Sequence, residues 1–202
     1  MHLDKHLNEA VLQFGVWTYA IIFLIIFCET GLVFLPILPG DSLLFAIGAL
    51  AALGSLDLKL CMLVMLIAAV IGDGVNYHVG KFIGPKVFEK QNSKVFKKEY
   101  LEKTESFFRR YGGKTIILAR FVPIVRTFAP FLSGVGRMNY GQFLVYNVVG
   151  AVLWVVLLTT SGYLFGELPF VKNNFSLVVL GIVFVSFLPA IVEGVKSRTQ
   201  AA

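Results

Sequence analysis

One stretch, residues 116–136, reads IILARFVPIVRTFAPFLSGVG. It has the length and apolar character of a membrane-spanning helix, since about 20 apolar residues cross a bilayer. Two arginines and two prolines interrupt it: Arg120, Pro123, Arg126 and Pro130. Proline removes a backbone donor and clashes with the preceding helical turn, so it breaks or kinks a helix. We therefore predict that this stretch is a re-entrant hairpin, which enters the membrane and returns to the same side.

The composition of the whole chain agrees with a membrane location. Of its 202 residues, 57% are hydrophobic and 15% are charged, whereas soluble domains carry about 25% charged residues. A soluble fold of this size would leave too much apolar surface in water. The net charge of +6 does not indicate nucleic acid binding, because the basic residues gather in one loop between apolar segments, where they set topology and contact anionic lipid. We predict a single membrane domain over residues 1–202.

A second broken segment lies toward the N-terminus. The apolar stretch from Val16 to Leu35 is long enough to span a membrane, and Glu29 interrupts it. The next apolar piece, from Ser42 to Gly54, is too short to span with ease. The residues between the two pieces include three that cannot continue a helix: Pro36, Pro39 and Gly40. We predict a first re-entrant hairpin over about residues 30–56.

Three further apolar stretches have the length of membrane spans: Leu60 to Val79, Gln142 to Phe165 and Phe175 to Val195. With the first stretch they make about four transmembrane helices. The predicted fold class is an all-α polytopic membrane protein that also contains two re-entrant hairpins and one amphipathic helix.

The amphipathic helix is expected within residues 81–114, which contain ten Lys or Arg and four acidic residues. Aromatic residues recur there at helical spacing with charges between them, which is typical of a helix on a membrane surface: Phe96, Tyr100, Phe107 and Tyr111. We place this helix at about residues 93–111 and expect Gly112 and Gly113 to end it.

The basic loops predict the orientation. Residues 81–114 and the C-terminus are expected on the cytoplasmic side, and counting spans places the N-terminus there too. The first hairpin then enters from outside and the second from inside, so the two are inverted. Residues 34–38 (FLPIL) also resemble residues 121–125 (FVPIV). Inverted repeats with broken segments are common in transporters, whose binding sites lie near the membrane midplane.

Five charged residues inside apolar segments are the candidate site: Glu29, Asp41, Asp73, Arg120 and Arg126. A charge at the bilayer centre costs at least about 2.5 kcal/mol on insertion scales, so such residues face the protein interior or a wet cavity and mark transport pathways. A buried carboxylate holds its proton more readily, so the three acids are candidates for proton coupling. Guanidinium groups match phosphate oxygens, so the two arginines are candidates for binding a phosphate. The alternative is that acids and arginines simply pair and hold the hairpins together.

The sequence contains no His-rich, Ser/His/Asp or metal-ligand cluster, so we predict neither an enzyme nor a bound metal or cofactor. Cys28 and Cys61 are interpreted as small buried hydrophobic residues, and Trp154 as a packing residue.

Taken in order, the motifs resemble those of the DedA family, whose shared region is also called the VTT or SNARE-associated domain. The resemblance is densest from about residue 29 to residue 154. It rests on Glu29-Thr30-Gly31, Pro39-Gly40-Asp41, Gly72-Asp73 through Tyr77, Gly80-Lys81, Phe107 to Gly112, Arg120 to Arg126, Pro130, Gly134, Met138, Phe143, Asn147, Gly150 and Trp154.

The resemblance implies a multi-pass protein of the bacterial inner membrane that moves lipid between leaflets. The lipid would be undecaprenyl phosphate or a phospholipid such as phosphatidylethanolamine, and transport would depend on the proton motive force. The family's functional acids match Glu29 and Asp41, and its arginines match Arg120 and Arg126. Alternatives are a passive phospholipid scramblase, a proton-coupled antiporter of ions or small solutes, and an assembly factor without transport. The identity of the lipid and a homo-oligomeric state are left open.

Overall fold

The structure is a computed structural model that describes residues 15–32, 40–87, 98–122, 125–169 and 171, without the side chains of 84–87, 98–103 and 107. Every regular element in these ranges is a helix. Three of the predicted hairpin breakers, Pro36, Pro39 and Pro123, lie outside the described residues. The predicted span from Phe175 to Val195 and both chain termini lie outside them as well.

The chain divides into two compact units. One unit holds residues 1–21, 37–62 and 156–202, and the other holds residues 22–36 and 63–155. We call them unit 1 and unit 2 and describe each by itself. The predicted single membrane domain stays a prediction.

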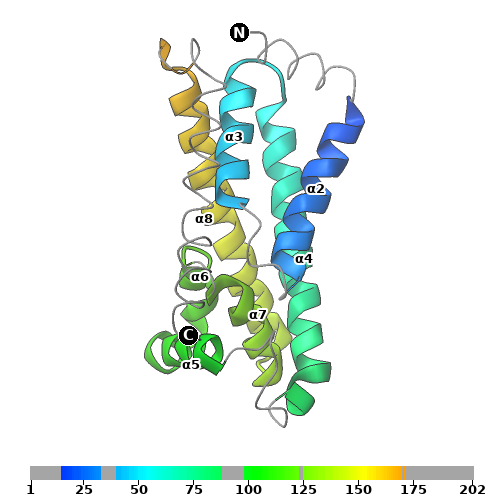
Figure 1. The fold of residues 1–202 in the computed structure, drawn as a ribbon, viewed down its shortest axis with the longest axis vertical. Coiled ribbons are helices and arrows are strands. Elements are labelled where there is room, and N and C mark those ends of the chain that lie inside the picture. The colour runs from blue at the N-terminus through cyan, green and yellow to red at the C-terminus, as the bar shows by residue number, and fades with distance from the viewer. Residues whose placement is uncertain (1–14, 33–39, 88–97, 123–124, 170, 172–202) are drawn as a thin grey trace, which may run out of the picture. The chain divides into compact units, whose positions relative to one another are not determined.

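Two long apolar helices are the most prominent elements, α4 (Leu58–Val87) and α8 (Tyr140–Gly166) (Figure 1). Both contain a stretch long and apolar enough to cross a membrane, Leu58–Ile83 in α4 and all of α8. One side of α4 exposes apolar side chains at intervals of three or four residues, which suits contact with lipid: Leu60, Leu63, Ile67, Ile71 and Val75. The two predicted spans are therefore confirmed as helices of membrane-crossing length.

The end predicted for the first of these spans, near Gly80 and Lys81, lies close to the end of the membrane-crossing stretch at Ile83, but the helix α4 itself continues to Val87. Gly80 does not end the helix. A Cβ atom there would collide with the backbone of Phe131, so this glycine allows α7 to approach α4. The predicted surface segment 81–114 is consequently not one unit, since its first residues belong to α4.

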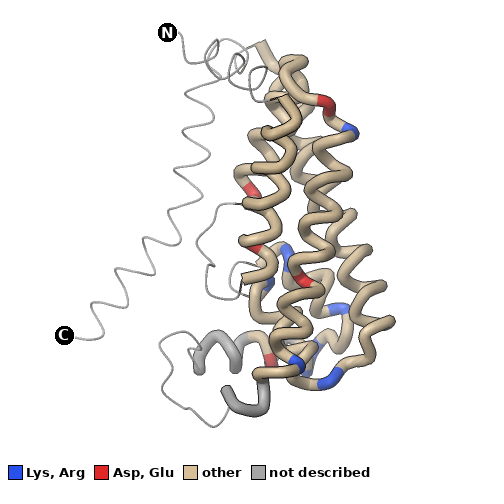
Figure 2. Tube along the Cα trace, turned by 90° about the vertical axis from the view of Figure 1, so that its right-hand side faces the viewer, with Lys and Arg blue, Asp and Glu red and all other residues tan. Residues whose placement is uncertain are grey.

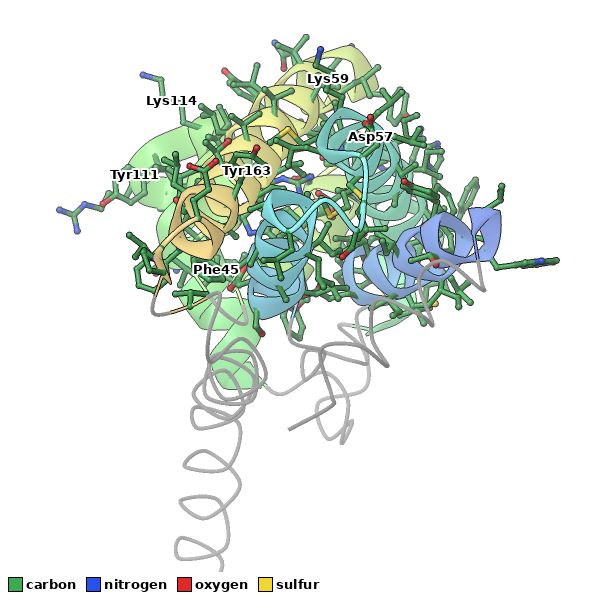
Figure 3. All side chains as sticks on the ribbon, turned by 90° about the horizontal axis from the view of Figure 1, so that it is seen from above. Phe45, Asp57, Lys59, Tyr111, Lys114 and Tyr163 are labelled. Carbon is green, nitrogen blue, oxygen red and sulfur yellow. The ribbon has the colours of Figure 1, made fainter. Side chains whose placement is uncertain are left out.

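Two shorter apolar helices are α2 (Val16–Gly31) and α3 (Gly40–Ala52). The 16 residues of α2 rise by about 24 Å, which is less than the roughly 30 Å thickness of a bilayer core. The short α3 matches the short piece predicted after the first break. In unit 1 it packs against the end of α8, where the rings of Phe45 and Phe165 lie 5.7 Å apart, and Figure 3 shows Phe45 beside Tyr163.

The second hairpin region consists of η1 (Gly112–Lys114), α6 (Thr115–Ala119) and α7 (Val125–Val135), which pack together with α5 (Lys98–Tyr111) (Figure 1). The helix α6 stops at Ala119, and the described residues that follow it, 120–122, are not helical, so the apolar stretch is broken there. Entry into the membrane from one side stays a prediction.

Pro130 was predicted to break this region, and that prediction is wrong, because Pro130 lies inside α7. A proline in a helix removes one backbone hydrogen bond, here the one to the carbonyl of Arg126. All residues from Thr127 to Gly134 are buried, so packing on the neighbouring helices holds α7 together despite that loss.

The helix α5 ends at Tyr111, and Gly112 follows with a positive φ of 56°. The predicted end at Gly112 is thus confirmed, since glycine adopts this left-handed conformation without strain. On α5, Thr104 is buried and Phe108 packs against α6 and α7. Tyr111 is exposed, and Figure 3 shows it at the outer side of unit 2 near Lys114.

Candidate functional site

The site begins where α2 and α4 cross in unit 2. A Cβ atom on Gly31 would lie 3.3 Å from the Cα atom of Gly72, so the two helices meet at a pair of glycines. Glu29 precedes this crossing on α2 and Asp73 follows it on α4. Their exposed fractions are only 1% and 4%. The glycine crossing therefore brings two carboxylates into the interior of unit 2.

Each carboxylate receives an arginine from the second hairpin region. Arg120 follows α6 and donates from Nη2 to Asp73 Oδ2 at 2.5 Å. Arg126 lies in the first turn of α7 and donates from Nη2 to Glu29 Oε1. Figure 2 shows how few charged residues the described helices carry, so the gathering of four of them in one place is a specific feature of this sequence.

Helix α8 supplies the third side of the site. Asn147 accepts a second hydrogen bond from Arg120 Nη2 at 2.5 Å, and its own amide donates to the carbonyl of Val70 at 3.1 Å. One turn later, a Cβ atom on Gly150 would lie 3.1 Å from Arg120 Cδ, so the arginine lies directly against the helix backbone. Asn147 and Gly150 therefore fix where the Arg120 side chain runs.

Asn76, which lies three residues after Asp73 on α4, holds the parts of the site together by hydrogen bonds. It is completely buried, and its amide nitrogen donates to the carbonyl of Thr127 at 2.8 Å and to that of Thr30 at 3.3 Å. One side chain thus ties the end of α2 and the start of α7 to α4. Since Glu29 precedes Thr30 and Arg126 precedes Thr127, Asn76 also sets the spacing of that ion pair.

A small cavity lies among these groups, with about 10 Å³ of water-sized space, roughly what one water molecule occupies by this measure. Its lining is Glu29, Thr30, Asp73, Arg120, Arg126, Thr127 and Trp154. A lipid headgroup does not fit. The described conformation is therefore one in which the arginines hold carboxylates and the cavity is closed to a larger ligand.

Of the five predicted site residues, the structure brings four together: Glu29, Asp73, Arg120 and Arg126. Asp41 lies in the first turn of α3, in unit 1. Its predicted place in the same site stays a prediction, and so do the roles assigned to all five residues.

Sequence reasoning missed Asn76 and Thr127, and it assigned Trp154 to packing alone. A signal for Asn76 was present, because it is a polar residue inside an apolar span and lies three positions after Asp73, on the same helical face. Thr127 takes part through its backbone carbonyl, and no sequence pattern marks such a role.

Comparisons with known proteins relate the chain to bacterial membrane proteins. The VTT domain matches residues 38–164. Protein DedA of Escherichia coli strain K12 is 56% identical over 204 residues, which covers 100% of this chain and 93% of that protein. The uncharacterized membrane protein Rv0364 of Mycobacterium tuberculosis H37Rv is 48% identical over 177 residues, or 87% of this chain and 78% of that protein. Inner membrane protein YqjA of E. coli K12 is 32% identical over 151 residues, or 75% of this chain and 69% of that protein. No solved structure matches significantly.

Proposed function

Since the chain belongs to the DedA family of membrane proteins, which carry the VTT domain, we propose that it moves a lipid with a phosphate-bearing headgroup across the bacterial inner membrane. The observation that supports this proposal most directly is the pair of arginines, Arg120 and Arg126, that line one cavity beside two carboxylates. A guanidinium group binds a carboxylate and a phosphate with the same planar donor geometry. A lipid phosphate can therefore take the place that a carboxylate now holds.

The proposed transport step is an exchange of partners. As the cavity opens, the lipid phosphate takes over Arg120 and Arg126, and the carboxylates of Asp73 and Glu29 lose their cations. A buried carboxylate without a cation favours its protonated form. Lipid binding is then linked to proton uptake, and return of the arginines to the acids releases both. Asp41 is proposed as a further proton-coupling acid.

The lipid tails require no enclosed path in this proposal. Exposed apolar side chains recur on α4 from Leu60 to Val75 and on α8 from Leu144 to Leu164, so hydrocarbon chains can stay in the bilayer while only the headgroup passes the site. The charges inside the protein lower the barrier for the headgroup, which is the part of a lipid that membrane hydrocarbon excludes.

The test is lipid movement in proteoliposomes of phosphatidylethanolamine and phosphatidylglycerol. Separate arms carry a fluorescent phosphatidylethanolamine or undecaprenyl phosphate, and the probe that reaches the opposite leaflet is measured. Arg120→Lys and Arg126→Lys keep the charge but lose the planar pair of donors that the guanidinium group offers. Each should therefore reduce the rate of lipid movement at least about tenfold. Arg109→Lys, at an exposed position of α5, is the matched control. Unchanged rates in both site variants would refute the phosphate-binding role.

The same vesicles separate this proposal from its alternatives. An imposed pH gradient should speed transport by the unsubstituted protein, and Glu29→Gln and Asp73→Asn should abolish that acceleration. Lipid movement that ignores the gradient in all three proteins would instead identify a passive scramblase. Movement of a small anion without lipid would favour an antiporter. Released inorganic phosphate would indicate an enzyme.

A further inference from the structure

The two arginines share a second partner besides their carboxylates. The Trp154 ring centroid lies 5.9 Å from Cζ of Arg120 and 5.6 Å from Cζ of Arg126. Both distances fall within the roughly 6 Å range over which an aromatic ring attracts a cation. Trp154 is 2% exposed, so water does not screen this attraction. One indole therefore lies within cation–π distance of both arginines of the site.

Trp154 is also one of three residues on a single face of α8 that contact the Arg120 side chain. Asn147, Gly150 and Trp154 are separated by three and four residues, so they lie on one face of the helix. Asn147 accepts a hydrogen bond from the guanidinium, Gly150 makes room for the aliphatic part, and Trp154 offers its ring. None of these contacts involves a carboxylate, so all three can persist when the Asp73–Arg120 ion pair breaks.

We propose that Trp154 is a positioning residue that holds both guanidinium groups in the cavity while they exchange carboxylate partners for the lipid phosphate. The inference rests on the proposed function and adds a residue to it. Between partners, each arginine is a buried cation without a counter-ion, which is the most unfavourable stage of the exchange. The electron-rich ring face lowers the free energy of that stage. Trp154 should therefore affect turnover more than the apparent affinity for lipid.

The chain offers a clean way to test this, because it contains only two tryptophans and the other, Trp17, is 72% exposed. In a Trp17→Phe background, every tryptophan analogue incorporated into the protein occupies position 154. Mono-, di- and trifluorotryptophan withdraw electrons from the ring and change its size little. We expect lipid turnover in proteoliposomes to fall stepwise across this series, by about tenfold in total, while the apparent KM for lipid changes less.

Two conventional variants separate positioning from packing. Trp154→Phe keeps a smaller ring face and should retain more turnover than Trp154→Leu, at equal amounts of folded protein judged by thermal unfolding in detergent. If Trp154 acts only in packing, lipid turnover should depend only on the amount of folded protein and should be equal across the fluorotryptophan series. Equal turnover across that series would overturn the inference.

Failure of the inference and failure of the proposed function give different results. If Arg120→Lys and Arg126→Lys lose lipid movement while the fluorinated series stays uniform, only the role of Trp154 is overturned. If the unsubstituted protein moves neither lipid probe, both proposals fail. A stepwise loss along the fluorinated series, together with loss in the lysine variants, supports both.

Discussion

The Asp73–Arg120 pair contributes to stability as well as to the proposed transport. Both side chains are 5% exposed, and removing one partner leaves the other as a buried charge. We expect Asp73→Ala and Arg120→Ala each to lower the free energy of unfolding by about 3–5 kcal/mol. The double variant should lose clearly less than the sum of the two, because no unpaired charge remains. Reversible unfolding in mixed micelles measures all three values.

The exposed Glu105–Arg109 pair on α5 is the control for this cycle, since its side chains are 47% and 77% exposed and lie 3.7 Å apart. Its coupling energy should stay below about 1 kcal/mol, because water screens an exposed pair. Equal coupling in the two cycles would contradict the buried character of the Asp73–Arg120 pair.

At the scale of elements, the crossing of α2 and α4 depends on Gly72. A Cβ atom there would collide with Thr30 Oγ1 and lie 3.1 Å from the backbone of Gly31 and of Phe27. Backbone atoms cannot move aside as a flexible side chain does. We expect Gly72→Ala to lower the unfolding free energy by about 1–3 kcal/mol and to displace Glu29 from Arg126, with a loss of lipid movement.

Gly74 is the matched control, two residues further along the same helix. A Cβ atom at Gly74 would meet only the Tyr140 hydroxyl, at an ordinary 3.6 Å. Gly74→Ala should therefore leave transport intact and raise stability by up to about 1 kcal/mol, because alanine favours a helix interior. If both variants behave alike, close packing at Gly72 does not position the site.

A second prediction at this scale concerns how α5 is held. Phe108 packs against the buried residues of both α6 and α7, whereas Tyr111 on the same helix is 38% exposed. Phe108→Ala should lower the unfolding free energy by roughly 2 kcal/mol, and Tyr111→Ala should have little effect. Protease cleavage within residues 98–111 should become faster in the first variant only. Equal cleavage rates would show that Phe108 does not anchor α5.

The elements also show how far sequence reasoning reaches. Apolar length predicted α4 and α8, and a glycine predicted the end of α5, because these features depend on local sequence. The continuation of α4 past Gly80 and of α7 through Pro130 depends on helix packing, which the local sequence does not reveal. The same division holds for the site. Charges inside apolar stretches identified its ionisable residues, whereas the hydrogen bonds of Asn76 end on backbone carbonyls that only the folded chain brings together.

For the molecule as a whole, the length of the apolar stretch of α4 can be compared with the thickness of the membrane. Lys59 and Lys81 are both exposed residues of this helix. They are 22 residues apart, so they are separated by about 33 Å along its axis, close to the roughly 30 Å of a bilayer core. Both ends of this apolar stretch therefore carry a cation that can reach an interface, which suits a helix that crosses the membrane once.

The orientation predicted from the basic loops places Lys59 outside the cell and Lys81 in the cytoplasm. The test uses Lys59→Cys and Lys81→Cys in a background where Cys28 and Cys61 are alanine. A membrane-impermeant maleimide added to intact spheroplasts should label the first variant and not the second, and in inside-out vesicles the pattern should reverse. Detergent-solubilised protein, in which both cysteines should react, controls for reactivity. Labelling in the opposite sense would invert the topology and reverse the sides from which the two hairpins enter. Labelling of both cysteines from one side would show that α4 does not cross the membrane, and the route proposed for the lipid tails along its outward side would then be untenable.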